Sequence, residues 1–318
     1  MTEKEKYRQL CAEELSIPIY SRDWWLDCVC GEVGWDVLLC CREGEIEASM
    51  PFYSPCKGVI FMPPYTQAMG VWFNPSFEDK SYSKDLYRKQ TVCENFIKQL
   101  PSSTYFSQSF HYSFTDWLPF YWKGYRQTTR YTYLLSDIEN KDVLWKNLNE
   151  NVRRNIQKAR DKYKLEVRKN VDINQFVEIT DKTFIRQGLR PYHPDFLKRL
   201  IEYSRKRNQG DIWGAYDVDG RLHTAVFVVW QKNNAYYIAG GGDPELRQSG
   251  AHALTLWEAI NEVSQHSTSF DFEGSMIKGV EHFFRGFGAK QMPYFVVEKG
   301  KMSPLKRFQI KIFRLCKW

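Results

Sequence analysis

The sequence predicts an α+β protein of two tandem domains of the same kind, each built on a mixed, mostly antiparallel sheet that is flanked by helices. The first observation behind this prediction is the length of 318 residues, which suits two domains of roughly 150 residues each. The second is a composition of 43% hydrophobic and 16% aromatic residues, which can supply two packed cores and excludes a disordered chain. The third is a strand, turn, strand pattern that occurs once in each half, around Gly44 and around Gly220, each time after one or two predicted helices.

The predicted first domain covers residues 1–138. Helices are expected at 3–15, 22–30 and 80–100, and strands at 35–41, 46–53, 59–62, 105–109 and 125–135. Residues 42–45 have the composition of a hairpin turn between the first two strands. Pro63, Pro64 and Gly70 then end the third strand, because proline and glycine interrupt regular structure.

The predicted second domain covers residues 139–300, and a basic C-terminal helix is expected at 301–318. Helices are expected at 141–162, 173–187, 194–207, 250–266 and 278–286, and strands at 211–216, 222–230, 235–239, 269–272 and 293–298. Residues 217–220 (Asp-Val-Asp-Gly) have the composition of a β-turn between the first two of these strands. The first helix has a strongly basic face at 152–164, either a solvated surface or a site for a phosphate-bearing ligand.

A glycine-rich segment, residues 240–252, joins the third strand of this domain to its fourth helix. Glycines let backbone N–H groups approach a phosphate, and the start of a helix adds a positive end, so the segment is a candidate anion site. The alternative is an ordinary loop in which Ser249 caps the helix. The candidate donor-binding residues are Ala239, Gly240, Gly241, Arg247, Gln248, Ser249, Gly250, Ala251 and His252.

Four segments of the second half carry a resemblance to known proteins. The pattern Arg247-x-x-Gly250-x-His252 is similar to the R/Q-x-x-G-x-G/A pyrophosphate loop of the GNAT acyltransferases. FDFEGS at 270–275 and FFRGFGAK at 283–290 resemble the closing segments of the Fem aminoacyltransferases and their FemAB-like relatives, and RRNIQKA at 153–159 and WEAI at 257–260 are also similar to that group. The resemblance implies two GNAT-like domains in tandem, of which the first lacks a phosphate loop. Two positions depart from the patterns: His252 replaces Gly or Ala, and Arg285 replaces the usual Lys of the Fem segment.

The resemblance also implies an activity, an acyl transfer in which an amine or hydroxyl attacks the donor directly and no Ser or Cys nucleophile is used. The expected donor is acetyl-CoA or another acyl-CoA, with the backbone at 239–241 stabilising the developing oxyanion. The alternative is an aminoacyl-tRNA donor with a peptidoglycan precursor as acceptor, as in the Fem enzymes. A second alternative is a binding protein that has kept the fold without catalysis.

The candidate catalytic residues lie in the closing segments. Asp271 and Glu273 alternate with phenylalanines on the expected strand 269–272, so both carboxylates are expected on one face. Glu273 is the predicted general base, or alternatively a cap of the following helix, and Asp271 either orients the acceptor or is structural. Arg285 is a candidate through the resemblance, and Tyr294 is either a proton donor or a core residue.

The remaining expectations concern metal, location and partners. The spacings of Cys28 with Cys30 and of Cys40 with Cys41 are not those of a zinc site, so no metal is expected. The chain lacks a run of about 18 apolar residues and starts with alternating charges, which favours a cytoplasmic protein. A net charge of +7 permits a polyanionic partner such as tRNA, and the basic tail either packs on the domain or contacts a membrane surface.

Overall fold

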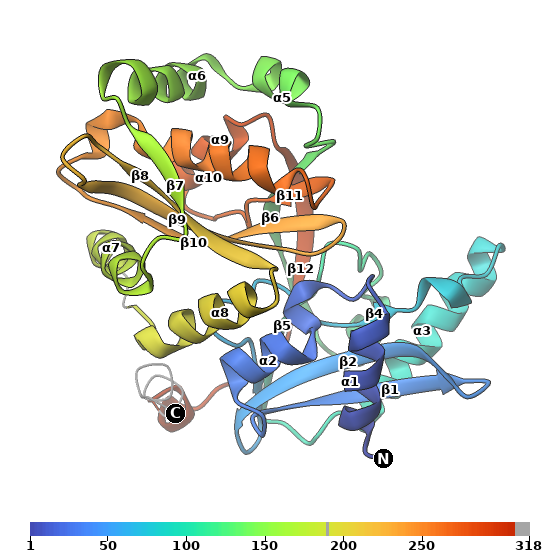
Figure 1. Cartoon of the computed structure of the whole chain (residues 1–318). Coiled ribbons are helices and arrows are strands. Elements are labelled where there is room, and N and C mark those ends of the chain that lie inside the picture. The colour runs from blue at the N-terminus through green and yellow to red at the C-terminus, as the bar shows by residue number, and fades with distance from the viewer. Residues whose placement is uncertain (189–190, 309–318) are drawn as a thin grey trace. The chain divides into compact units, whose positions relative to one another are not determined.

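The computed structural model describes residues 1–188 and 191–308 and divides into two compact units (Figure 1). The first unit is Met1–Arg130 together with the segment that begins at Pro293, and the second is Tyr131–Met292. The domain boundaries expected from the sequence, 1–138 and 139–300 with a tail at 301–318, stay a prediction.

The first unit is a mostly antiparallel sheet with flanking helices. Its strands occur in the order β1-β2-β3-β5-β12, with β4 paired to β2, and only the β3–β5 pair among the described pairs of this unit is parallel. The strands are β1 (Trp35–Arg42), β2 (Glu45–Cys56), β3 (Val59–Phe61), β4 (Trp72–Phe73), β5 (Tyr105–Ser109) and β12 (Lys290–Gly300). The helices are α1 (Glu3–Glu13), α2 (Asp23–Cys30), α3 (Tyr82–Gln99) and α4 (Leu118–Trp122), with 3₁₀ turns at Ile19–Ser21 and Pro75–Phe77.

The second unit has the same kind of architecture, which confirms the predicted fold class. Its strands occur in the order β6-β11-β10-β9-β8-β7, and β10 and β11 run parallel while their neighbours pair antiparallel. The strands are β6 (Arg126–Ser136), β7 (Glu166–Lys169), β8 (Gly210–Tyr216), β9 (Leu222–Trp230), β10 (Asn234–Gly242) and β11 (Ser269–Asp271). The helices are α5 (Lys141–Asn147), α6 (Glu150–Gln157), α7 (Ile173–Arg186), α8 (Pro194–Lys206), α9 (Ala251–Val263) and α10 (Lys278–Arg285), with a π-helical turn at Lys158–Lys162 and a 3₁₀ turn at Arg247–Ser249.

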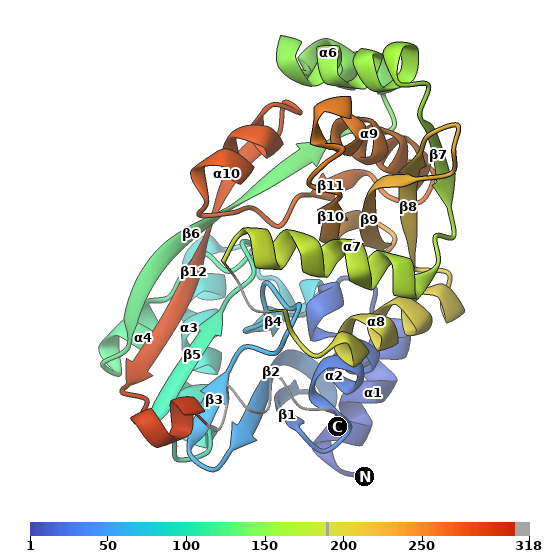
Figure 2. The same ribbon diagram turned by 90° about the vertical axis from the view of Figure 1, so that its left-hand side faces the viewer.

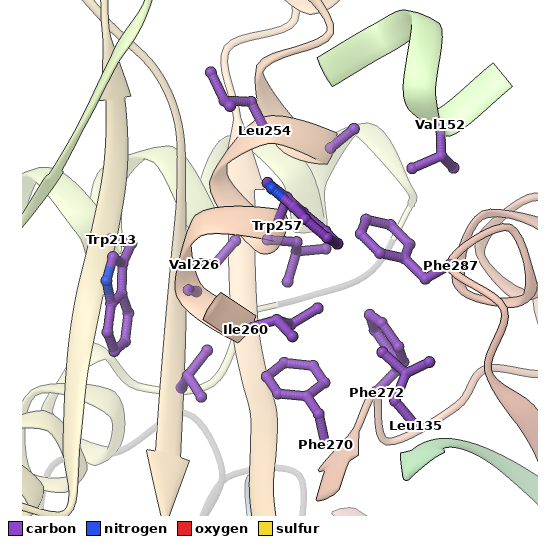
Figure 3. Close-up of a cluster of buried hydrophobic side chains, with 14 of the residues drawn as sticks. Leu135, Val152, Trp213, Val226, Leu254, Trp257, Ile260, Phe270, Phe272 and Phe287 are labelled. Carbon is purple, nitrogen blue, oxygen red and sulfur yellow. The ribbon is translucent and has the colours of Figure 1, made fainter. Parts of the chain in front are cut away.

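Helices cover both faces of the second sheet. Helix α9 packs on β8 and β9, and α7 packs on β10 from the opposite face, as Figure 1 and Figure 2 show. Beneath α9, an aromatic and aliphatic cluster joins the helix to the sheet, with Trp257 and Ile260 above Phe270 and Phe272 (Figure 3). Each such buried side chain contributes roughly 1.5–3 kcal/mol relative to exposure. The cluster therefore holds α9 against the sheet.

The helix predicted at 141–162 is wrong in one respect, because the structure divides it. Helix α5 ends at Asn147, and α6 begins at Glu150 after Asn149 in an extended conformation. The Asn149 side chain accepts a hydrogen bond from the Val152 amide at 2.8 Å, and an asparagine that caps a helix start is a common helix boundary. A π-helical turn then follows α6 where a continuous α-helix was expected.

The third strand of the second unit is longer than predicted. The sequence indicated a strand at 235–239 followed by a glycine turn, whereas β10 continues to Gly242. Gly240 and Gly241 are strand residues, and each is small because a neighbour fills the space of a side chain. A Cβ at Gly240 would meet the Tyr237 hydroxyl, and one at Gly241 would meet the backbone of α7 at Ile179 and, 2.7 Å away, at the Thr180 Cα.

Three short elements were not predicted: β4, α4 and β7. They contain two to five residues, too few to show a periodic pattern. The last part of the predicted basic tail, residues 309–318, lies outside the described residues. Within the described ranges, no helix combines the length and the apolar character that crossing a membrane requires.

The close approach of β10 to α7 makes a stability prediction for two adjacent glycines. Gly241→Ala forces a methyl group against α7 backbone that cannot rotate away, so we expect the free energy of unfolding to fall by about 2 kcal/mol or more. Gly242→Ala is the matched control, because the nearest atom to a Cβ at Gly242, the His223 carbonyl oxygen, is 3.5 Å away. We expect this variant to change the free energy of unfolding by less than about 1 kcal/mol. Urea unfolding of both variants measures the difference, and equal losses would contradict the packing described here.

Candidate functional site

Strands β10 and β11 separate after a short stretch of pairing. They pair at three positions, of which the last is Tyr236 with Asp271. Strand β11 ends there, while β10 continues to Gly242. The register between β10 and β9 also shifts between Tyr237 and Ala239, which leaves Ile238 as the extra residue of a β-bulge. We call the opening between the two strands beyond Tyr236 and Asp271 the splay. Backbone groups of β10 there have no hydrogen-bonding partner in β11.

The loop from β10 to α9 has the geometry of an anion site. Gly250 lies in the left-handed region with a φ of 78°, and a Cβ at this position would meet the Asn155 carbonyl of α6, so glycine is required there. The predicted cap Ser249 is not the N-cap residue, which is Gly250, but its hydroxyl accepts from the Ala251 amide at 3.3 Å. The Ala253 amide donates to the Gly250 carbonyl at 3.1 Å, and the His252 amide has no hydrogen-bond partner among the described residues, so it is the first-turn N–H left at the positive end of α9.

Cationic side chains add to this positive end. The Arg247 and Gln248 side chains are exposed in the loop, and Arg247 forms no ion pair with any described residue. Partial burial and the nearby Arg247 charge lower the pKa of Arg186 at the end of α7, so these two guanidinium groups lie close enough to repel. Among the described residues, neither guanidinium has an ion-pair partner, and such cations near the loop favour a phosphate ligand.

His252, the departure from the loop pattern, points into the protein. Its Nδ1 is 2.9 Å from the Thr224 hydroxyl of β9, and that hydroxyl donates to the Gly241 carbonyl at 2.7 Å. The ring contacts Tyr237, with centroids 6.1 Å apart, and Phe283 at 5.4 Å. Burial lowers the pKa of His252 to about 4. The side chain therefore leaves the phosphate side of the loop open and lies against the splay.

Tyr237 is a site residue that the sequence did not indicate. Its ring packs against His252 and Phe284, and its hydroxyl occupies the space above Gly240. Burial raises the pKa of Tyr237 well above its usual value, and the negative charge of Glu273 raises it further. The available signal was the glycine three positions after the tyrosine, but aromatic residues are so frequent in this chain that the pattern was not distinctive.

The two predicted carboxylates occupy different surroundings. Strand β11 ends at Asp271, and Glu273 has a left-handed φ of 59°, so the expectation that both alternate along one strand is wrong. Asp271 is buried and accepts hydrogen bonds from the Thr132 hydroxyl and, at 2.7 Å, from the Glu273 amide. Burial raises the pKa of Asp271 to about 6. Glu273 is half-buried and close enough to Tyr237 to affect its ionisation.

Arg285 and Tyr294 each have other surroundings in the structure. The Arg285 side chain is exposed on α10 and forms an ion pair with Glu281 at 3.0 Å. Tyr294 is buried in the part of β12 that belongs to the first unit. The structure thus brings together the loop, His252, Tyr237 and Glu273 in the second unit, and the catalytic roles expected of Arg285 and Tyr294 stay predictions.

A cavity of about 460 Å³ lies farther along α9, on the side of β7 and β8. Two of its cations are already paired with its two carboxylates, Arg160 with Glu258 and, at 2.6 Å, Lys169 with Glu262. It does not include the loop or the splay, so we do not take it as the reaction site. Within the described residues, no group of three His, Cys, Asp or Glu side chains could hold a metal ion.

Comparison with known proteins agrees with this geometry. Residues 146–285 match the family model described as an acetyltransferase (GNAT) domain. Among solved structures, FemX superposes with a TM-score of 0.67 at 10% identity over 99% of both chains. The C-terminal domain of a putative lysylphosphatidylglycerol synthetase from Agrobacterium fabrum gives 0.58 at 11% identity, covering 98% of this chain and 96% of that one, and L-PGS from Bacillus licheniformis gives 0.55 at 10%, covering 99% and 97%. No curated protein sequence matches.

The second half of the chain is therefore a GNAT domain, and the protein is an acyltransferase. Outside this domain the comparison shows the fold, and the fold shared with FemX extends over almost the whole of both chains. The resemblance read from the loop and the closing segments is confirmed at this level.

The raised pKa of Asp271 predicts a pH dependence of stability. The folded protein holds a proton on this carboxyl up to about pH 6, whereas the unfolded chain releases it near pH 4. Stability from this group is therefore lost as the pH rises from about 4 to about 6, by about 2 to 3 kcal/mol in the free energy of unfolding. Asp271→Asn should remove this dependence relative to the wild type, as measured by urea unfolding at pH 4.5 and pH 7. The exposed Asp161→Asn is the control, and parallel curves for wild type and Asp271→Asn would contradict the assignment.

Proposed function

We propose that the protein transfers an acyl group from an acyl-CoA to an amine or hydroxyl acceptor, by direct attack on the thioester in the splay of the second unit. The observation that carries the proposal is that the β10–β11 pairing ends at Tyr236 and that the loop after β10 leads into the positive N-terminal end of α9, with the exposed Arg247 in that loop. A thioester needs a gap between strands to enter the sheet, and its pyrophosphate needs donors at one end of that gap.

The donor phosphates bind at the loop in this proposal. The His252 amide at the start of α9 and the Arg247 guanidinium would hold the pyrophosphate. The inward orientation of His252 supports this, because a side chain on the outer face of the loop would compete with the ligand. The acyl carbonyl would then lie along β10, where the bulge at Ile238 leaves a backbone N–H for the developing oxyanion.

Tyr237 is the proposed proton donor to the leaving thiolate. Its hydroxyl stays protonated at neutral pH, because burial and the Glu273 charge both oppose ionisation. When the leaving thiolate takes this proton, Tyr237 becomes a phenolate. The solvent reprotonates the phenolate after product release. Glu273 keeps its predicted role of general base as one candidate for the proton of the acceptor.

Isothermal titration with CoA and acetyl-CoA tests the donor site. Arg247→Glu replaces a phosphate-binding cation by an anion at the helix start, and we expect a loss of affinity of about tenfold or more. Lys232→Glu is the matched control, since Lys232 is equally exposed at the opposite end of the β9–β10 hairpin and should leave the affinity unchanged. A wild-type protein that binds neither compound would contradict the acyl-CoA proposal.

An aminoacyl-tRNA donor is the second candidate, with a peptidoglycan precursor or a lipid as acceptor. A basic surface beside the donor loop favours it, formed by α6 and the residues that follow it: Arg153, Arg154, Lys158, Lys162 and Lys164. Within it, the Lys158 and Lys162 ammonium groups lie 5.7 and 5.9 Å from the Tyr163 ring. FemX and lysylphosphatidylglycerol synthetase, two of the solved structures that this chain resembles, have names that indicate aminoacyl transfer for those proteins.

The basic surface predicts salt-sensitive RNA binding if this second candidate is correct. Lys158→Glu with Lys162→Glu should weaken the binding of a tRNA and reduce the slope of log K against log salt by about 2, because each phosphate contact releases roughly one counterion. Lys206→Glu with Lys232→Glu makes the same charge change on exposed residues outside α6 and should have little effect. Filter binding at several salt concentrations measures both slopes, and equal slopes for the two double variants would contradict a tRNA site on this surface.

A further inference from the structure

His252 occupies the last position of the donor loop, where the GNAT pattern has glycine or alanine. A small residue there has no side-chain chemistry, whereas this chain places an imidazole between the first turn of α9 and the end of β10. The ring lies against Tyr237, the first β10 residue beyond the paired stretch, and against Phe283 of α10. This position is within the space where the acyl group and its acceptor meet in the proposed function.

The hydrogen bonds of Thr224 determine the tautomer of this imidazole. The hydroxyl of Thr224 has one hydrogen, and it donates this hydrogen to the Gly241 carbonyl at 2.7 Å. The contact at 2.9 Å between the same hydroxyl and Nδ1 of His252 must then run in the other direction, with Nδ1–H as donor. Nε2 consequently carries the lone pair, and no described residue donates a hydrogen bond to it.

The groups that surround the ring keep it neutral. From β9 it faces Thr224, from α10 Phe283, and from β10 Tyr237, which is the only one of the three that titrates. Tyr237 is itself neutral at physiological pH, because burial and Glu273 raise its pKa. Burial alone lowers the pKa of His252, and no described carboxylate is paired with the ring. The lone pair on Nε2 is therefore available at every pH above about 5.

We propose that His252 is a catalytic residue, the general base that accepts the proton of the attacking nucleophile through Nε2, with Thr224 as the residue that fixes its tautomer. This assignment rests on the proposed acyl transfer in the splay. It gives the role of base to His252 in place of Glu273, whose charge acts on the Tyr237 hydroxyl.

The nitrogen or oxygen of the acceptor forms a bond to the acyl carbon, and its proton passes to Nε2 of His252. The C–S bond of the thioester breaks, and the thiolate takes a proton from the Tyr237 hydroxyl. The imidazolium then returns its proton to the tyrosinate through solvent or product, so that both side chains end in their starting forms. Neither an oxidant nor a metal ion is involved in this step.

The first test is independent of activity. Nitrogen-15 NMR of the histidine rings reads tautomer and charge directly, and the chain has six histidines, so the signal lost in His252→Gln identifies the residue. We expect the Nδ1–H tautomer, still neutral at pH 5.5, and a mixture of tautomers in Thr224→Val. An Nε2–H tautomer, or a ring that is charged at pH 6, would overturn the proposal.

The second test uses acetyl-CoA with water as the acceptor and measures the release of free CoA with a thiol reagent. His252→Gln keeps a donor for Thr224 but cannot accept a proton, so we expect kcat to fall about 10²-fold or more with KM for acetyl-CoA unchanged. Added imidazole should restore turnover to His252→Ala, which a structural role would not allow. His266→Gln is the matched control, because His266 is exposed just beyond the other end of the same helix.

The pH profile separates the two candidate bases. A base with the pKa of His252 keeps the wild-type activity down to about pH 5, and the acidic limb should be lost in His252→Gln and kept in Glu273→Gln. The opposite pattern, with kcat lost in Glu273→Gln and kept in His252→Gln, would overturn the proposal. The proposal would also be overturned if the protein bound CoA in the titration but showed no turnover that depends on His252. Failure of CoA binding itself would instead overturn the proposed function.

Discussion

The separation of β10 from β11 after three residue pairs is the constraint on which the site depends. A parallel pair that continued beyond Tyr236 and Asp271 would close the sheet and leave no entry for a ligand. Packing on both faces holds the two strands where they are. Helix α7 presses on Gly241 from one face, and the cluster of Trp257, Phe270 and Phe272 anchors α9 on the other (Figure 3). The opening is thus a consequence of well-packed neighbours, and it needs no flexible element.

This packing also separates a positively charged outer part of the site from an inner part whose side chains are neutral. At the outer end, the start of α9 and the side chain of Arg247 present positive charge to solvent, which suits the phosphates of a donor. Inside, His252 and Tyr237 are both held neutral by burial, one by a lowered pKa and the other by a raised pKa. A neutral base and a neutral acid, side by side in a region of low dielectric, can exchange protons with a substrate without separating charge in the ground state.

Glycines connect these two regions of the site. Gly240 makes room for the Tyr237 hydroxyl, Gly241 allows α7 to approach, and Gly250 allows α6 to contact the loop. In the sequence, all three have the pattern of phosphate-loop residues, because a glycine-rich segment between a strand and a helix indicates anion binding. In the structure, these glycines accommodate neighbours that come from elsewhere in the chain, and the phosphate-binding role falls to the Arg247 side chain and the α9 start only in the proposed function.

The sequence by itself determined the fold class, most of the strands and helices, and the motifs that resemble GNAT acyltransferases, because these depend on local periodicity and on short contiguous motifs. Tertiary structure alone decided which side chains meet at the splay. Tyr237 and His252 meet because α9 packs on β8 and β9 beside β10, and Glu273 comes near Tyr237 where the chain turns sharply after β11. The physical reason is that contacts between elements, and the burial that shifts a pKa, arise from residues distant in sequence, which a local pattern does not record.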